Sequence, residues 1–113
     1  GGERDEGKRE AMGAIASRLA DRIIITSDNP RGEDPAGIAR SVMAGVPDGA
    51  AELELDRRRA ISAALAGARP DDVVIVAGKG HETRQIIGGR SLPFDDVAVV
   101  REVLGTVAEV STT

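Results

Sequence analysis

The stretch Ile23-Ile24-Ile25-Thr26-Ser27-Asp28-Asn29-Pro30-Arg31 decides the fold, because an uninterrupted β-branched run ends abruptly in a polar loop. Residues 23–26 suit a strand that is covered on both faces, as in a parallel sheet. Pro30 fixes its own φ and biases the preceding residue toward extended backbone, so Asp28 and Arg31 should be held in a stiff frame. Ligands of open α/β sheets bind beyond the carboxyl ends of strands, and we predict that this loop lies there.

A second apolar run ends in the same way. Residues 73–77 read as another buried strand and lead into Gly78-Lys79-Gly80-His81-Glu82. The glycines allow the backbone to approach a ligand closely. We therefore expect the two polar loops to face one crevice.

The remaining pattern predicts a three-layer Rossmann-like α/β domain with a mainly parallel sheet, because strands alternate with helices along the chain. We expect Asp34, Asp56 and either Asp95 or Asp96 to cap three of the helices. Gly88-Gly89 is a turn signal in an otherwise irregular segment. The predicted elements are a helix over residues 8–20, a strand over 23–26, a helix around Ile38 and Val42 closed by Gly45, a half-exposed edge strand over 51–55, a helix around Ile61, Ala64 and Leu65 ended by Gly67 and Pro70, a strand over 73–77, and a last helix containing Val99, Val100, Val103 and Leu104.

Composition restricts the classes of function. The 113 residues fit one domain, and without cysteine neither a disulfide nor a thiolate metal site is available. The formal net charge of −4 argues against nucleic acid as a partner. No apolar run is long enough for a membrane span and no signal-peptide pattern is present, so we expect a soluble, cytoplasmic protein.

Three motifs in this order resemble the C-terminal domain of the Mur ligases, specifically those that add meso-diaminopimelate. They are Gly1-Gly2-Glu3-Arg4-Asp5, Asp28-Asn29-Pro30-Arg31 and Gly78-Lys79-Gly80-His81-Glu82. The resemblance covers nearly the whole chain. It implies that residues 1–113 form part of the amino-acid-binding domain of an ATP-dependent amide ligase in peptidoglycan synthesis.

The resemblance also implies that the chain is truncated at its N-terminus. The family has an opening strand and helix, and then a strand that feeds the Gly1-Gly2 turn. The resemblance likewise implies that the family's central ATP-binding domain and N-terminal nucleotide-sugar domain are not contained in residues 1–113. We expect the missing elements to leave a sheet edge unpaired, which favours self-association.

The site residues follow from the resemblance. A guanidinium grips a carboxylate through two parallel hydrogen bonds, and the family uses this arginine for the distal carboxylate of meso-diaminopimelate. The expected substrate-binding residues are Arg4, Asp28, Asn29, Pro30, Arg31, Gly78 and Glu82, with Arg31 on the distal carboxylate, Glu82 on the distal ammonium and Gly78 in backbone contact. Arg4 should also lie near the nucleotide phosphates, and Lys8 is a second candidate there. The match is weaker at Glu3, where the family often has Asp, and at Glu10, where it often has Pro.

The implied reaction requires no catalytic residue from this chain. In the family, ATP phosphorylates the carboxylate of UDP-N-acetylmuramoyl-L-alanyl-D-glutamate, and the amine of meso-diaminopimelate then attacks the acyl phosphate. This domain would orient that amine. ATP and Mg²⁺ are expected on the missing central domain, so the chain alone should be inactive.

Other motifs have simpler interpretations. The loop at residues 78–82 is not a Walker A motif, because Lys79 is followed by glycine. His81 is predicted to be a structural imidazole that orients this loop, with no metal. Arg57-Arg58-Arg59 is predicted to be the solvated first turn of a helix. Two other classes of function stay open, a stand-alone module for a zwitterionic amino acid or nucleotide, and an inert fragment that dimerises.

Overall fold

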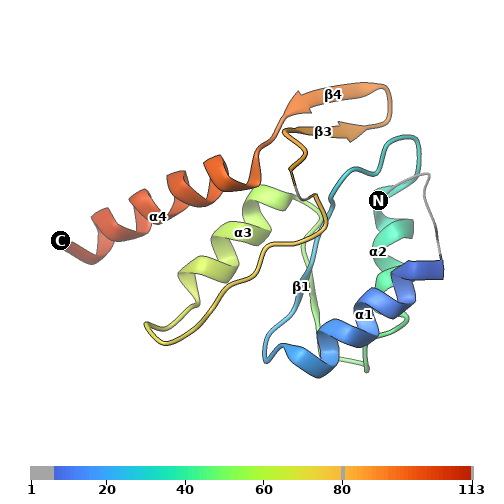
Figure 1. Ribbon diagram of the computed structural model, residues 1–113, viewed down its shortest axis with the longest axis horizontal. Helices are drawn as coiled ribbons and strands as arrows, with labels where there is room; N and C mark the ends of the chain where they lie inside the picture. Colours follow the sequence, from blue (N-terminus) through green and yellow to red (C-terminus); the bar gives the residue numbers. More distant parts are fainter. Residues whose placement is uncertain (1–6, 80, 113) are drawn as a thin grey trace.

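The computed structural model describes residues 7–79 and 81–112, with side chains up to residue 105. Helices and strands alternate over most of the chain, and a hairpin precedes the last helix (Figure 1). The elements are α1 (Gly7–Leu19), β1 (Ile24–Ile25), α2 (Pro35–Met43), β2 (Glu52–Leu53), α3 (Arg57–Ala66), β3 (Arg84–Ile87), β4 (Arg90–Pro93) and α4 (Asp96–Thr112). None of the helices in these ranges is long and apolar enough to cross a membrane.

The architecture is the predicted three-layer α/β arrangement. Strands β1 and β2 are parallel, with Ile24 opposite Glu52, and β1 contacts both α2 and α3. Helices α1 and α2 pack on one side of the pair, and α3 packs with α4 on the other (Figure 1). Each side has its own small core. One is built on Ile25, Ala39 and Val46, and the other on Ile61, Val99 and Val103.

The predicted helix boundaries are confirmed where a cap defines them. The Asp34 carboxylate accepts a hydrogen bond from the Ala36 N–H at 3.2 Å, and Pro35 is the first helical residue. Asp56 accepts from the Arg59 N–H at 3.0 Å. Asp95, one of the two predicted caps of the last helix, accepts from the Val97 N–H at 2.9 Å.

Helices α1 and α2 pack closely through glycines. A Cβ at Gly13 would lie 2.0 Å from the Val42 carbonyl oxygen, and one at Gly45 would lie 1.9 Å from the Glu10 carbonyl oxygen. Gly45 does follow the end of α2 as predicted, but its φ is not positive. Close backbone approach is therefore the reason for glycine at this position.

The predicted strand over residues 73–77 is wrong. The segment pairs with no strand in the described part of the chain, and the side chains of Val73 and Ile75 are 85% and 83% exposed. Local β-branched composition favoured a strand here, but a strand requires a neighbouring backbone to pair with.

The expected self-association through an open sheet edge stays a prediction.

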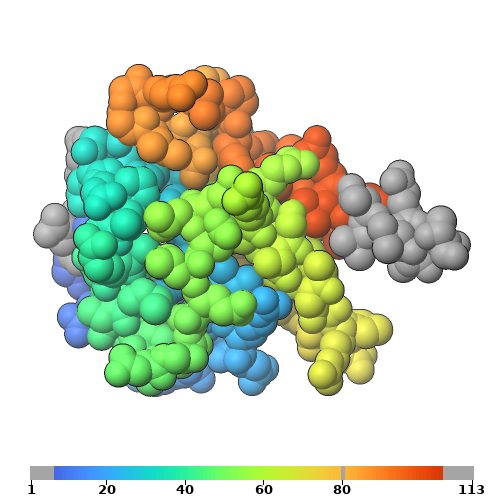
Figure 2. Space-filling view, turned by 180° about the vertical axis from the view of Figure 1, so that it is seen from behind, coloured from blue at the N-terminus to red at the C-terminus, as the bar shows by residue number. Residues whose placement is uncertain are grey.

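The sequence pattern also missed a hairpin. Strands β3 and β4 pair antiparallel, with Ile87 opposite Arg90, so Gly88-Gly89 forms the predicted turn. Gly88 has a φ of +60°, as the first central residue of a II′ turn requires. Figure 2 shows this hairpin in orange at one end of the molecule.

Candidate functional site

The two polar loops meet, as the sequence predicts. The side-chain amide of Asn29 donates to Glu82 Oε2 at 2.5 Å, and its Oδ1 accepts from the Ile86 N–H at 2.7 Å. Asn29 is only 2% exposed, and Pro30 beside it is fully buried. A buried amide thus joins the loop after β1 both to the glycine loop and to the hairpin.

Arg31 lies at the surface of this junction in a constrained conformation. Its φ is +55°, a left-handed value that is uncommon for a residue other than glycine. The hairpin fixes this backbone, because the Arg31 N–H donates to the Ile86 carbonyl at 2.7 Å and the Gly88 N–H donates to the Arg31 carbonyl. Arg31 Nη2 lies 3.7 Å from Glu82 Oε2, so the predicted cation and anion of the site are neighbours.

The glycine loop contacts the first loop through its backbone. Gly78 has a φ of +108°, and a Cβ there would lie 3.5 Å from the Asp28 side chain. The next residue points inward, since Lys79 Nζ donates to the Arg84 carbonyl at 2.5 Å and lies 5.9 Å from the centre of the Phe94 ring. This side chain is turned away from solvent and anchors the loop through its bond to the Arg84 carbonyl, and the same burial lowers the pKa of Lys79.

A buried ion pair ties the first loop to α1. Both terminal nitrogens of Arg9 donate to the Glu33 carboxylate, at 2.9 and 3.1 Å, and the Arg9 side chain is 5% exposed. Such a bidentate pair fixes orientation as well as distance. The loop that carries Arg31 is therefore held on two sides, by α1 and by the hairpin.

The other predicted residues are placed differently. Arg4 lies outside the described residues, and Lys8 is exposed in the first turn of α1. His81 is exposed, and its ring has no hydrogen-bond partner in the described ranges. The prediction that His81 is a satisfied imidazole that orients the loop is therefore wrong. The glycine loop is held instead by Lys79 and by the Asn29 contact to Glu82.

Arg57 contradicts the prediction of a solvated helix start. It is 2% exposed, and its guanidinium pairs with Asp96 of α4, with Nε and Nη2 each 2.7 Å from a carboxylate oxygen. No local signal in the arginine triplet distinguishes Arg57 from its neighbours, because the partner is 39 residues away.

The sequence also gave no indication that Gln85 supports the site. Its side chain donates to the Asp28 carbonyl at 3.0 Å.

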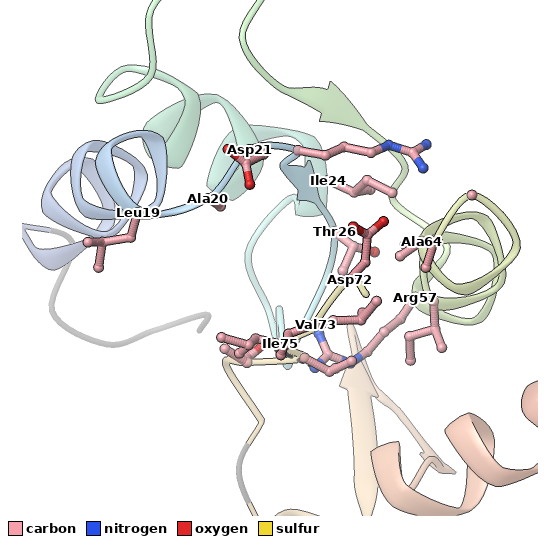
Figure 3. A pocket seen from close by; sticks show the side chains of 18 of the residues that line it. Leu19, Ala20, Asp21, Ile24, Thr26, Arg57, Ala64, Asp72, Val73 and Ile75 are labelled. Atoms are coloured by element: carbon pink, nitrogen blue, oxygen red, sulfur yellow. Dashed lines mark hydrogen bonds between the residues drawn. The ribbon is translucent and has the colours of Figure 1, made fainter. Parts of the chain in front are cut away.

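A separate groove of about 580 Å³ runs beside β1. Figure 3 shows Ile24, Thr26, Val73 and Ile75 around it, with Arg57 also in its lining. The residues of the Asn29 junction are not part of this lining. The junction is thus distinct from this groove, which has both apolar and charged residues in its lining.

The fold and the junction define an α/β domain that presents a neighbouring cation and anion at the carboxyl end of a parallel strand. Such a pair suits a small zwitterionic ligand, because each charge has its complement. The sequence profile of the family described as "Mur ligase, glutamate ligase domain" matches residues 1–80. The chain belongs to the Mur ligase family.

Relatives agree with this assignment. The chain is 58% identical over 97 residues to a UDP-N-acetylmuramoyl-L-alanyl-D-glutamate--2,6-diaminopimelate ligase of Prochlorococcus marinus, covering 85% of this chain and 19% of that protein. It is 55% identical over 108 residues to the ligase of the same name from Nitrosomonas europaea, covering 96% and 21%. A solved structure of a ligase with that name superimposes with a TM-score of 0.86 at 42% identity, over 94% of this chain and 22% of its own. The chain thus spans about a fifth of the length of these relatives.

Proposed function

We propose that the chain is the amino-acid-binding part of an ATP-dependent ligase that adds meso-diaminopimelate to UDP-N-acetylmuramoyl-L-alanyl-D-glutamate in peptidoglycan synthesis. The observation that carries this proposal is the Arg31–Glu82 pair, with 3.7 Å between Nη2 and Oε2. The names of the relatives supply the substrate class. The alternatives of a stand-alone module and an inert fragment have no comparable support.

The ligand would replace this internal pair. The distal end of meso-diaminopimelate has an ammonium and a carboxylate on one carbon, so its two charges are neighbours like those of the site. Arg31 would take the carboxylate and Glu82 the ammonium, while Asn29 holds Glu82 in place. Gly78 would offer backbone where a side chain would crowd the ligand. Asp28 and Pro30 complete the frame of the loop.

The chain's contribution to the reaction would be orientation. Gripping the distal end directs the other amine of the amino acid toward the activated carboxylate, and this lowers the entropic part of the barrier. No acid or base from the described residues is required. Arg4 and Lys8 remain candidates for contact with phosphate, and the cytoplasmic location stays a prediction.

Mg²⁺, which the family implies, does not fit the residues described, and for ATP the described residues offer the exposed Lys8 as a candidate phosphate contact. No group of three or more histidines and carboxylates within residues 7–79 and 81–112 is placed to hold a metal ion. The lysine of the glycine loop is buried against the Arg84 carbonyl, so it does not face a phosphate. We propose that the nucleotide and the metal bind to another part of the full-length protein.

The test is formation of the tripeptide product by the full-length protein. Purified protein is incubated with ATP, Mg²⁺ and the UDP-linked dipeptide, together with meso-diaminopimelate, L-lysine or no amino acid. The products are identified by mass spectrometry. We expect product and phosphate release that depend on meso-diaminopimelate. Binding of the amino acid without ligation would support the stand-alone module instead.

A further inference from the structure

Arg57 makes contacts that an ordinary helix-pairing residue does not make. Besides pairing with Asp96, its Nη1 donates to the Ser27 carbonyl and its Nη2 to the Ala77 carbonyl, both at 3.1 Å. Ser27 is the last residue before the Asp28 loop, and Ala77 is the last residue before the Gly78 loop. One guanidinium therefore holds the starting points of both ligand loops.

No β-ladder performs this task in the described part of the chain. Residues 73–77 pair with no strand there, so hydrogen bonds between strands do not set their position relative to β1. The groove lies between the two segments, and Arg57 is part of its lining (Figure 3). Asp96 fixes the plane of the guanidinium through two short bonds, which leaves its remaining N–H groups for the two carbonyls.

We propose that Arg57 is a positioning residue for amino-acid recognition, because it sets the separation and direction of the two loops that carry Arg31 and Glu82. The inference rests on the proposed function for its substrate. The claim that Arg57 positions the two loops rests on its hydrogen bonds alone. Lysine could not replace Arg57, since one ammonium cannot pair with Asp96 and span both carbonyls in the same plane.

The chain offers a matched control on the same helix pair. Arg58 of α3 pairs with Glu102 of α4 at 2.7 Å, but both side chains are more than half exposed. If the role of Arg57 were only to join α3 to α4, loss of either pair would have the same kind of effect. If Arg57 positions the loops, only loss of the Arg57–Asp96 pair should disturb the two loops.

The first measurement is steady-state kinetics of the full-length protein with Arg57→Lys, Arg57→Met, Asp96→Asn and Arg58→Met. We expect the Arg57 and Asp96 variants to raise KM for meso-diaminopimelate by about tenfold or more, since a displacement of about 1 Å costs up to roughly 10²-fold. KM for ATP should stay within about twofold, and Arg58→Met should change neither value. Equal increases in both KM values, or an unchanged KM for the amino acid in Arg57→Lys, would overturn the proposal.

The second measurement needs no substrate. Amide hydrogen exchange of the full-length protein should rise in peptides covering residues 28–33 and 78–87 in Arg57→Lys, and not in Arg58→Met. Exchange that is unchanged in these loops, or raised equally in α1 and α2, would contradict the positioning role. If wild-type protein does not use meso-diaminopimelate, the proposed function fails while this measurement still decides the role of Arg57. If Arg57→Met does not fold, Arg57→Lys decides, because it keeps the buried charge.

Discussion

Asn29 and Glu82 are 53 residues apart in the chain, and the Asn29 amide donates to Glu82 Oε2 at 2.5 Å. The same side chain accepts from the Ile86 N–H at 2.7 Å, so one buried amide satisfies groups of two other segments. The carboxylate that we assign to the ligand's ammonium is thereby oriented before the ligand arrives. Preorganisation of this kind reduces the cost of binding.

Asn29→Ala should weaken both stability and recognition. The Ile86 N–H would lose its acceptor, which costs about 1–3 kcal/mol at full burial and less for this partly buried group, and Glu82 would lose its support. Asn29→Asp is the matched variant, because it keeps an acceptor for Ile86 but places a second carboxylate against Glu82. We expect urea unfolding to show less destabilisation for Asn29→Asp than for Asn29→Ala, while calorimetry shows weak meso-diaminopimelate binding in both. Wild-type affinity in Asn29→Asp would refute the role of Asn29.

Gly45→Ala should destabilise the packing of α1 against α2. The new Cβ would meet backbone atoms, with the Glu10 carbonyl oxygen at 1.9 Å and the Ala14 nitrogen at 2.8 Å, so neither neighbour can rotate away. Overpacking of this kind costs about 1–3 kcal/mol, to be measured by urea denaturation. Gly89→Ala is the control, because a Cβ there meets nothing within 4 Å. Equal unfolding midpoints for the two variants would show that α1 and α2 are not packed as described.

Lys79 should make the free energy of unfolding depend on pH in the alkaline range. Burial lowers its pKa from the ordinary value of 10.5, and the nearby Asp96 only partly opposes this. At pH values between the lowered pKa of Lys79 in the folded chain and its ordinary pKa in the unfolded chain, the unfolded chain binds more protons. The free energy of unfolding should therefore rise with pH over this range. The chain has no tyrosine or cysteine to titrate there, and its other lysine, Lys8, is exposed. Urea unfolding at several pH values should lose this rise in Lys79→Met and keep it in Lys8→Met. A rise that persists in Lys79→Met would assign it to another group.

Sequence reasoning succeeded where the determinants are local. Asp34 with Pro35 and Asp56 define helix starts through bonds to residues two or three positions away, so α2 and α3 were predicted well. The rule for strand ends applies to the loop after β1, whereas residues 73–77 form no strand, so the meeting of the two loops was predicted from a premise that is only half right. Gly88-Gly89 between two short runs was a hairpin signal that was read only as a turn.

The failures concern partners distant in the sequence. Residues 73–77 have strand composition, but pairing depends on a neighbouring backbone that local composition does not reveal. Arg57 looked like Arg58 and Arg59, and only the position of Asp96 distinguishes it. The left-handed backbone of Arg31 depends on its bonds to the hairpin. Each of these features is set by tertiary contacts.

The central claim is that Arg31 reads the distal carboxylate of meso-diaminopimelate, and specificity constants test it most directly. The kcat/KM of the full-length protein is measured for meso-diaminopimelate and for L-lysine, which lacks that carboxylate, in wild type, Arg31→Ala and Arg31→Gly. Arg31→Gly is the control for the backbone, since glycine adopts the φ of +55° without strain.

We predict that both variants lose about 2–5 kcal/mol, roughly 30-fold or more, for meso-diaminopimelate and far less for L-lysine. The two variants should agree, because both lack the guanidinium. Equal losses for the two amino acids, or recovery of activity in Arg31→Gly, would mean that Arg31 only supports the loop, and would contradict the claim.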